Sequence, residues 1–253
     1  RLRGKWTVGR WQRTLSPDSE QEPGYALLQA YWDYSVGLFR PLKKDYDAVL
    51  SFMWPHHFAA QKVNAQRKIA WVHTDFSRVG ADSRKDLCLW HSFDRIAVVS
   101  EDCAKTFLQR YPEAASLVGT VENVLSKAVV TALSEQGNTD DMPDDGGFRL
   151  LSVGRFCYAK GFDIAVAICR ELLDRGVRLK WYIIGFGPDE ALIRQRIAAL
   201  RLEKQFFILG KKINPYPYMR ACDLYVQPSR YEGKAVTVRE AQMLGKPVAI
   251  TAY

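Results

Sequence analysis

The sequence predicts an α/β protein with two domains and parallel sheets. From Phe148 onward, short apolar stretches typical of buried strands alternate with segments of helical periodicity. Such alternation is typical of a parallel sheet covered by helices on both faces. The stretch GNTDDMPDDGG at 137–147 is acidic and rich in turn formers, so we interpret it as a linker. The predicted domains are therefore residues 1–136 and 148–253.

The individual elements follow from apolar periodicity and from glycine or proline at their ends. In the first domain we expect a buried strand at 47–53, further strands at 68–73, 95–100 and 119–123, and helices at 25–42, 55–66, 83–92, 101–111 and 127–136. In the second domain we expect strands at 148–153, 179–184, 206–209, 224–227 and 248–251, and helices at 161–175, 189–200 and 216–221, with a last helix that begins near Lys234 and ends at Gly245.

The charge and composition narrow the range of functions. The chain has 253 residues and a net charge of +8, which favours anionic partners. A nucleic-acid role would rest on this charge alone, because the basic residues are not interleaved with aromatic ones in a recognisable module. There is no run of about 18 apolar residues that could span a membrane. The five cysteines contain no CxxC and indicate reduced thiols in the cytosol, and the four histidines lack metal-binding spacing.

Glycines and charged residues follow several of the predicted strands. They are Gly154 and Arg155 with Lys160, Gly185 in the sequence GFGP, Gly210 with Lys211, and the stretch from Ser229 to Glu232. Ligands of parallel sheets bind at the carboxyl ends of strands, so these turns are candidate binding loops. Arg155 and Lys160 together suit a diphosphate, since Arg can bind two oxygens and Lys supplies a compact charge. A basic loop in water is the alternative for this pair.

The stretch from Ser229 to Thr251 combines an acidic residue, a glycine turn and a helix. Unpaired NH groups and the dipole at the helix start favour a phosphate there, and Gly233 lets the backbone come close. Glu232 and Glu240 are eight residues apart, so the two carboxylates could share one face. A carboxylate beside a phosphate needs another role, such as binding sugar hydroxyls. The alternative is a capped surface helix with two solvated glutamates.

These segments together resemble the GT4 family of retaining glycosyltransferases, which have the GT-B fold of two Rossmann-like domains with a cleft between them. The resemblance rests on WVHTDFS (71–77), VGRFCYAKGFD (153–163), IIGFGPDEALIRQ (183–195) and the segment 206–251, and the E-x7-E spacing is its most specific part. The residues in and around these segments are most similar to those of the bacterial capsule and exopolysaccharide branch of the family. The resemblance implies transfer of a hexosyl group from a nucleotide-diphosphate sugar, expected to be UDP-linked, to a glycan or lipid-linked acceptor with retention of configuration.

The resemblance also implies roles for the candidate residues. The donor diphosphate would be bound by Arg155, Lys160 and the amides of Gly233, Lys234 and Ala235, without a metal ion or other cofactor. Glu240 would hold the ribose hydroxyls, Glu232 would contact the donor sugar, and Gly210 with Lys211 would border the base. His73, at the end of a predicted strand, would approach the sugar from the first domain, although a structural histidine is its alternative role. The expected catalytic residues are Glu232, His73, Arg155 and Lys160, and Gly154 and Gly185 complete the expected donor-binding set.

Compared with the family pattern, the chain is expected to be an internal part of a longer enzyme, with its first, acceptor-side domain truncated and its second, donor-binding domain truncated at its C-terminal end. A nucleotide-sugar epimerase on the same fold and a non-catalytic nucleotide-sugar-binding partner subunit are the alternative functions. Residues 1–13 hold five basic residues and no acid, which suggests peripheral contact with an anionic membrane. The expected location is cytoplasmic, with such contact on the inner face of the cell membrane.

Overall fold

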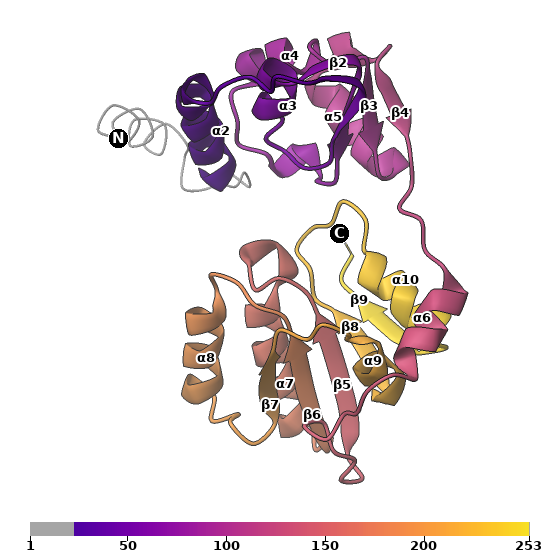
Figure 1. The fold of residues 1–253 in the computed structure, drawn as a ribbon. Coiled ribbons are helices and arrows are strands. Elements are labelled where there is room, and N and C mark those ends of the chain that lie inside the picture. The colour runs from indigo at the N-terminus through magenta and orange to yellow at the C-terminus, as the bar shows by residue number, and fades with distance from the viewer. Residues whose placement is uncertain (1–22, 253) are drawn as a thin grey trace. The chain divides into compact units, whose positions relative to one another are not determined.

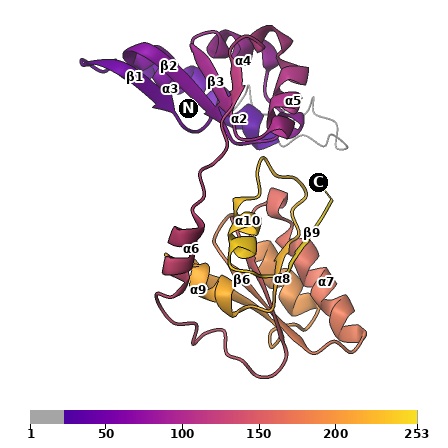
Figure 2. The ribbon, with the colours of Figure 1, turned by 90° about the vertical axis from the view of Figure 1, so that its right-hand side faces the viewer.

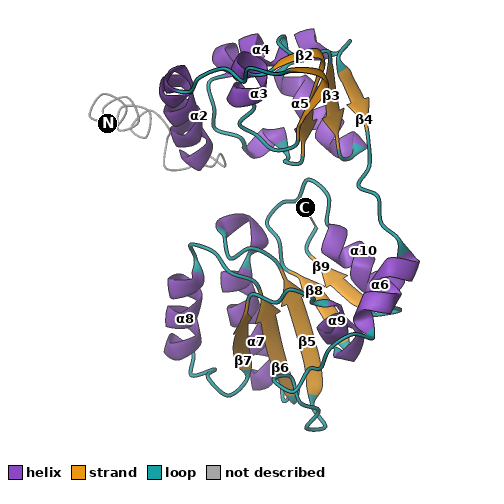
Figure 3. Cartoon of the chain, in the orientation of Figure 1, coloured by secondary structure: helices purple, strands orange, loops and turns teal. Residues whose placement is uncertain are grey.

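The computed structural model describes residues 23–252, which form two α/β units (Figures 1 and 3). The first unit ends at Asn123 and the second begins at Val124. Neighbouring strands are parallel throughout both sheets. The predicted α/β class with parallel sheets is therefore confirmed.

The first unit contains a four-stranded sheet in the order β1-β2-β3-β4. Its strands are β1 (Asp45–Ser51), β2 (Asn64–Val72), β3 (Arg95–Val98) and β4 (Val118–Thr120). Its helices are α2 (Pro23–Ser35), α3 (His57–Lys62), α4 (Ser83–Trp90) and α5 (Glu101–Arg110), with short 3-10 turns η1 (Val36–Leu38), η2 (Phe76–Arg78) and η3 (Pro112–Ala114).

Side-chain caps and one aromatic cluster explain where the helices of the first unit lie. The Asp82 side chain accepts bonds from the first amides of α4, and the Ser100 side chain does so for α5. The buried rings of Trp90 and Phe107 pack edge to face, with centroids 5.1 Å apart. They belong to the core that lies between these helices and the sheet.

The first strand differs from its prediction, because β1 is largely exposed instead of buried. It lies at one end of the sheet order and pairs with β2 alone among the described strands. The side chains of Leu50, Phe52 and Met53 are each more than half exposed. An apolar run predicts a strand, but burial depends on the elements that cover it.

The second unit contains a five-stranded sheet in the order β7-β6-β5-β8-β9. Its strands are β5 (Phe148–Val153), β6 (Leu179–Ile184), β7 (Phe206–Gly210), β8 (Leu224–Gln227) and β9 (Val248–Ile250). Its helices are α6 (Lys127–Ser134), α7 (Phe162–Asp174), α8 (Glu190–Ala199), α9 (Tyr216–Ala221) and α10 (Val236–Met243), with the 3-10 turn η4 (Tyr158–Lys160).

Both faces of this second sheet are buried, as its apolar strands predict. One core joins the sheet to α7 and α8, with Trp181 and Phe162 fully enclosed. The other core joins the opposite face to α9 and α10, with Tyr182 and Met219 fully enclosed (Figure 2). A sheet held rigidly from both sides gives the loops at its carboxyl edge a fixed base.

The chain divides at a different point from the linker that the sequence suggests at 137–147. Helix α6 lies before that segment, yet it packs against α9 and α10 of the second unit. The Asn214 side chain donates to the carbonyls of Leu133 (2.7 Å) and Gln136 (3.1 Å), which satisfies the end of α6. Asp141 and Asp145 also pair with Lys212 and Lys180 of the sheet region.

Candidate functional site

The candidate residues of the second unit lie at the carboxyl edge of its sheet. Gly154 and Arg155 follow β5, Gly185 follows β6, and Gly210 ends β7. The loop from Pro228 to Ala235 follows β8. Because these strands are parallel and adjacent, their following loops meet at the same edge.

Gly161 brings the loop after β5 into contact with the loop after β8. Its φ is +63°, and a Cβ at this position would overlap the carbonyl oxygen of Pro228. Only glycine combines this conformation with so close a backbone approach. The preceding residue, Lys160, is thereby held beside the loop that carries Glu232.

Arg230 clamps the same two loops together. Its guanidinium donates to both carboxylate oxygens of Asp163, at 2.8 and 2.7 Å, and to the carbonyl of Tyr158 at 2.8 Å. It also lies 4.2 Å from the centre of the Tyr158 ring. The Arg230 hydrogen bonds lower the pKa of Asp163, against the opposing effect of its burial. This bidentate pair fixes the first turn of α7 to the loop after β8.

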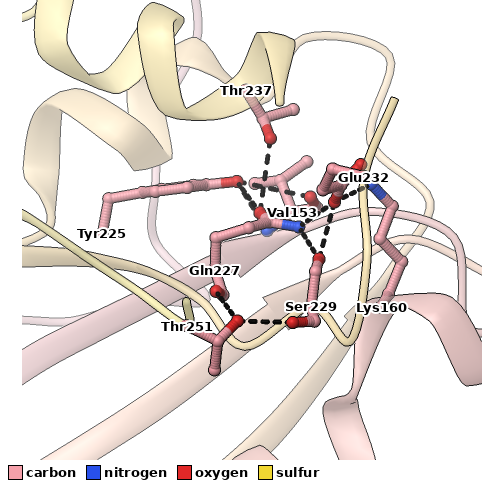
Figure 4. A network of polar contacts seen from close by, with 8 residues as sticks. All are labelled: Val153, Lys160, Tyr225, Gln227, Ser229, Glu232, Thr237 and Thr251. Carbon is pink, nitrogen blue, oxygen red and sulfur yellow. Dashed lines mark hydrogen bonds and ion pairs between the residues drawn. The ribbon is translucent and has the colours of Figure 1, made fainter. Parts of the chain in front are cut away.

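Lys160 and Glu232 form an ion pair at the centre of the site (Figure 4). The Lys160 Nζ lies 2.5 Å from Glu232 Oε1. The same oxygen accepts bonds from Ser229 Oγ at 2.6 Å and from Gln227 Nε2 at 3.0 Å. The Glu232 side chain is only 9% exposed, so it is not the solvated glutamate of the alternative interpretation.

Glu240 is a second buried carboxylate, in the interior of α10. It is 9% exposed, and Tyr216 OH donates to its Oε1 at 2.8 Å. Burial raises the pKa of Glu240, and the bond from Tyr216 acts in the opposite direction. The helix begins at Val236, two residues later than predicted, so Glu232 lies in the loop before it. Loop contacts, and not a shared helix face, therefore position Glu232.

The glycines of the GFGP turn accommodate the chain itself. A Cβ at Gly185 would overlap the carbonyl of Gly154, and a Cβ at Gly187 would overlap the backbone of Phe156. Phe156 N also donates to the carbonyl of Phe186 at 2.9 Å. This turn therefore packs on the loop after β5 and supports it.

Two other basic residues of the site lie at its surface. Arg155 and Lys211 are both exposed. The Lys211 Nζ lies 5.3 Å from the centre of the Phe186 ring, and Phe186 is itself 58% exposed. These side chains are accessible to an anionic or planar ligand.

His73 lies in the first unit, whereas the other candidate residues lie in the second. It directly follows β2, and its ring is 4.4 Å from that of Phe52, centroid to centroid. The His73 ring also stacks on that of Trp71 in β2, with centroids 6.3 Å apart. Partial burial lowers the pKa of His73, against the effect of a hydrogen bond that the ring donates to the backbone of Phe52. The ring is therefore neutral near pH 7.

Sequence reasoning missed the residues that support the candidate carboxylates. Gln227 and Ser229 hold Glu232, and Tyr216 holds Glu240. A signal for the first two was present, since a glutamine and a serine flank Pro228 directly after the apolar residues of β8. The contacts of Arg230 join residues 67 positions apart and left no local signal.

Three further findings concern metal binding, membrane-spanning helices and the state of the cysteines. Among residues 23–252, no group of three or more His, Cys, Asp or Glu side chains could hold a metal ion. Within that same range, no helix is long and apolar enough to cross a membrane. All five cysteines are free thiols.

Comparison with known proteins shows that the part of the chain that carries the site is similar to glycosyltransferases. Residues 140–253 match the family described as glycosyl transferases group 1. Over 110 residues the chain is 32% identical to a 2-deoxystreptamine glucosyltransferase of Streptomyces kanamyceticus, a match that covers 43% of this chain and 28% of that protein. Over 108 residues it is 33% identical to the amylovoran biosynthesis glycosyltransferase AmsK of Erwinia amylovora, which covers 40% of this chain and 26% of that protein.

The likeness to solved structures extends over both units. The structure of Anabaena Alr3699/HepE in complex with UDP and glucose matches with a TM-score of 0.62 and 17% identity, over 88% of this chain and 61% of that chain. A likeness at this identity establishes the fold. The chain therefore has the GT-B fold, and its residues 140–253 are similar to the glycosyl transferases group 1 family.

Proposed function

We propose that this chain is part of a glycosyltransferase that moves a hexosyl group from a nucleotide-diphosphate sugar to a glycan or lipid-linked acceptor, with retention of configuration. The observation that carries the proposal is the Lys160–Glu232 pair at the carboxyl edge of a group 1 domain. The UDP in the HepE complex supports a UDP-linked donor. The amylovoran relative supports a product of the capsule or exopolysaccharide type.

In this proposal, positive groups bind the donor diphosphate without a metal ion. Arg155 and Lys160 neutralise the phosphates, and the start of α10 adds the partial charge of its helix dipole. The first turn of α10 holds no acidic residue, and Ala235 supplies no side-chain cap, so this end of the helix suits an anion. The amides of Gly233, Lys234 and Ala235 approach the same phosphates. Stabilising the leaving diphosphate in this way is electrostatic catalysis.

The two buried carboxylates bind hydroxyl groups of the donor. Glu240 takes the ribose hydroxyls, and its bond from Tyr216 occupies Oε1 and leaves Oε2 for the ligand. Glu232 contacts the donor sugar near the reacting centre, and His73 of the first unit is a further catalytic residue in this proposal. Gly210 and Lys211 border the base, where the exposed ring of Phe186 offers a stacking surface.

Calorimetric titration with UDP and with GDP tests the donor site. We expect one nucleotide to bind, and we expect Arg155→Ala and Glu240→Ala each to weaken binding about tenfold, as for the loss of a charged hydrogen bond. Arg175→Ala is the matched control. That residue directly follows α7 and pairs with Glu171, so the same charge is removed at the end of the helix that is opposite to the loop after β5. Absence of binding to the unsubstituted chain would contradict the proposal.

The reaction itself is tested by product analysis. A donor that binds is incubated with candidate glycan and lipid-linked acceptors, and the anomeric configuration of the product is read by proton NMR. Retention is expected, and an inverted product would contradict the retaining mechanism. Conversion of the donor sugar without an acceptor would indicate an epimerase instead.

The proposal includes peripheral contact with an anionic membrane through residues 1–13, which lie outside the described residues. Replacing their five basic residues by serine should reduce sedimentation with phosphatidylglycerol vesicles. Unchanged sedimentation would contradict this part of the proposal.

A further inference from the structure

Three donors hold Glu232 at one of its two oxygens. Lys160, Gln227 and Ser229 all donate to Oε1 (Figure 4). Within residues 23–252, the hydrogen bonds to this carboxylate go to Oε1 and not to Oε2. An oxygen with three donors has no capacity for another. Oε2 is therefore the atom with which Glu232 can accept a bond from a ligand hydroxyl.

The orientation of the Gln227 amide is determined by its neighbours. Its Nε2 donates to Glu232 Oε1 and, at 2.7 Å, to Ser229 Oγ. A carboxylate only accepts hydrogen bonds, so the NH₂ group must face Glu232. The Gln227 Oε1 faces the other way and accepts bonds from Tyr225 OH at 2.9 Å and Thr237 Oγ1 at 3.4 Å.

Tyr225 anchors this chain of hydrogen bonds to the sheet. Burial raises the pKa of Tyr225, so its hydroxyl remains protonated and donates to Gln227. The hydroxyl also accepts a bond from the backbone amide of Val153, at the end of β5, at 3.4 Å. A continuous network therefore runs from β5 through Tyr225 and Gln227 to Glu232.

The three donors to Glu232 differ in their freedom to move. Gln227 and Ser229 are 0% and 1% exposed, whereas the Lys160 side chain is 23% exposed. A lysine is a flexible chain with a compact charge, and a diphosphate at this site competes with Glu232 for it. If Lys160 turns to the phosphates, Gln227 and Ser229 still hold Oε1.

We propose that Gln227 and Ser229 are positioning residues, which keep Oε2 of Glu232 directed at the donor sugar while Lys160 exchanges between Glu232 and the diphosphate. The inference rests on the proposed donor site. In this site, Gln227 and Ser229 allow the sugar to be recognised independently of the phosphates. The site then has two parts. Lys160 binds the diphosphate, and the buried network of Gln227 and Ser229 positions Glu232 for the sugar.

The Kd values of the full chain for UDP and for UDP-glucose distinguish these two parts, because only UDP-glucose carries the sugar. We expect Gln227→Met and Ser229→Ala to change the Kd for UDP by less than about twofold. We expect both substitutions to weaken binding of UDP-glucose by about fivefold, the typical loss for one buried hydrogen bond. Ser229→Thr keeps the hydroxyl and should restore the ratio of the two Kd values.

Ser152→Ala is the matched control for a purely structural effect. Ser152 is a fully buried serine of the same sheet, and its Oγ accepts a bond from Trp181 Nε1 at 3.0 Å. Its replacement should lower the melting temperature without changing the ratio of the two Kd values. An equal loss of UDP and UDP-glucose binding in Gln227→Met would overturn the inference.

A double-mutant cycle tests whether Gln227 acts through Glu232. Glu232→Gln should itself weaken UDP-glucose binding selectively, and Gln227→Met should then have no further effect. Additive losses would overturn the positioning role, and so would a ratio that Glu232→Gln leaves unchanged. If the unsubstituted chain binds neither compound, the donor site itself is refuted and the inference with it. If the unsubstituted chain binds UDP, but the Gln227 and Ser229 variants bind UDP-glucose as tightly as it does, the inference fails and the donor site stands.

Discussion

His56 is a fully buried histidine of the first unit, and at the residue scale it makes the stability of this unit depend on pH. Its Nδ1 lies 2.7 Å from Ser51 Oγ, and its ring packs against Trp90 and Phe93. Burial lowers the pKa of His56 to about 3, and the nearby His57 and His73 act in the same direction. The native state therefore holds this ring neutral, while the unfolded chain protonates it near pH 6.5.

The sign of the effect follows from which state binds the proton. Below pH 6.5 the unfolded state binds a proton that the native state excludes, so the free energy of unfolding falls as the pH drops towards 3. We expect a loss of about 2 kcal/mol between pH 7.5 and pH 5 from this residue. Urea unfolding of the wild type and His56→Asn measures it. The variant should show a flatter pH dependence, and replacing the exposed His91 in the same way should not. Equal slopes in wild type and His56→Asn would refute the prediction.

Gly161 is the residue whose replacement should disturb both stability and ligand binding. In Gly161→Ala, the positive φ costs about 1 kcal/mol, and the new Cβ overlaps the carbonyl of Pro228. The loops carrying Lys160 and Glu232 must then separate, so UDP binding should weaken. Gly176→Ala is the control, because Gly176 has φ +82° and no other atom lies within 4 Å of the place that a Cβ would take. We expect it to lower the melting temperature less and to leave UDP binding intact.

At the scale of elements, Arg230 joins the start of α7 to the loop after β8. We expect Arg230→Lys to weaken UDP binding about three- to tenfold, because lysine cannot make the two parallel bonds to Asp163. Arg175→Lys is the control, because it alters an exposed pair at the end of α7 in which two guanidinium nitrogens donate to one oxygen of Glu171. Calorimetry on both variants checks this, and a loss of similar size in the two would show that the clamp has no special role.

The elements also show what the sequence could predict. The bounds of β5, β6, α9 and β8 agree with the prediction, because apolar runs and flanking glycines or prolines are local signals. The carboxyl-edge loops were recognised for the same reason. The exposure of β1 and the late start of α10 were not predicted, since they depend on neighbouring elements. The supports of Glu232 and Glu240 come from long-range contacts, which no local pattern indicates.

At the scale of the whole molecule, the placement of α6 decides which piece of the chain can fold independently. Val130 of α6 is 3% exposed although it precedes the acidic segment at 137–147. Residues 124–253 expressed alone should therefore be more stable than residues 137–253. Burial of one valine contributes about 1.5–3 kcal/mol, and the bonds from Asn214 to the end of α6 are also lost in the shorter piece.

A pair of neighbouring residues tests the same packing within the full chain. Val130 is buried, whereas Val129 beside it on α6 is 55% exposed. We expect Val130→Ala to lower the free energy of unfolding by about 1–2 kcal/mol, because it removes buried methyl groups. Val129→Ala should change it by less than about 0.5 kcal/mol. Urea titration followed by hydrogen exchange of the backbone amides of β5 to β8 reports on the second unit, because six of the seven tryptophans precede residue 124 and their fluorescence would mask that of Trp181. If the two substitutions cost the same, α6 is not part of that cooperative unit, and the second unit begins after it.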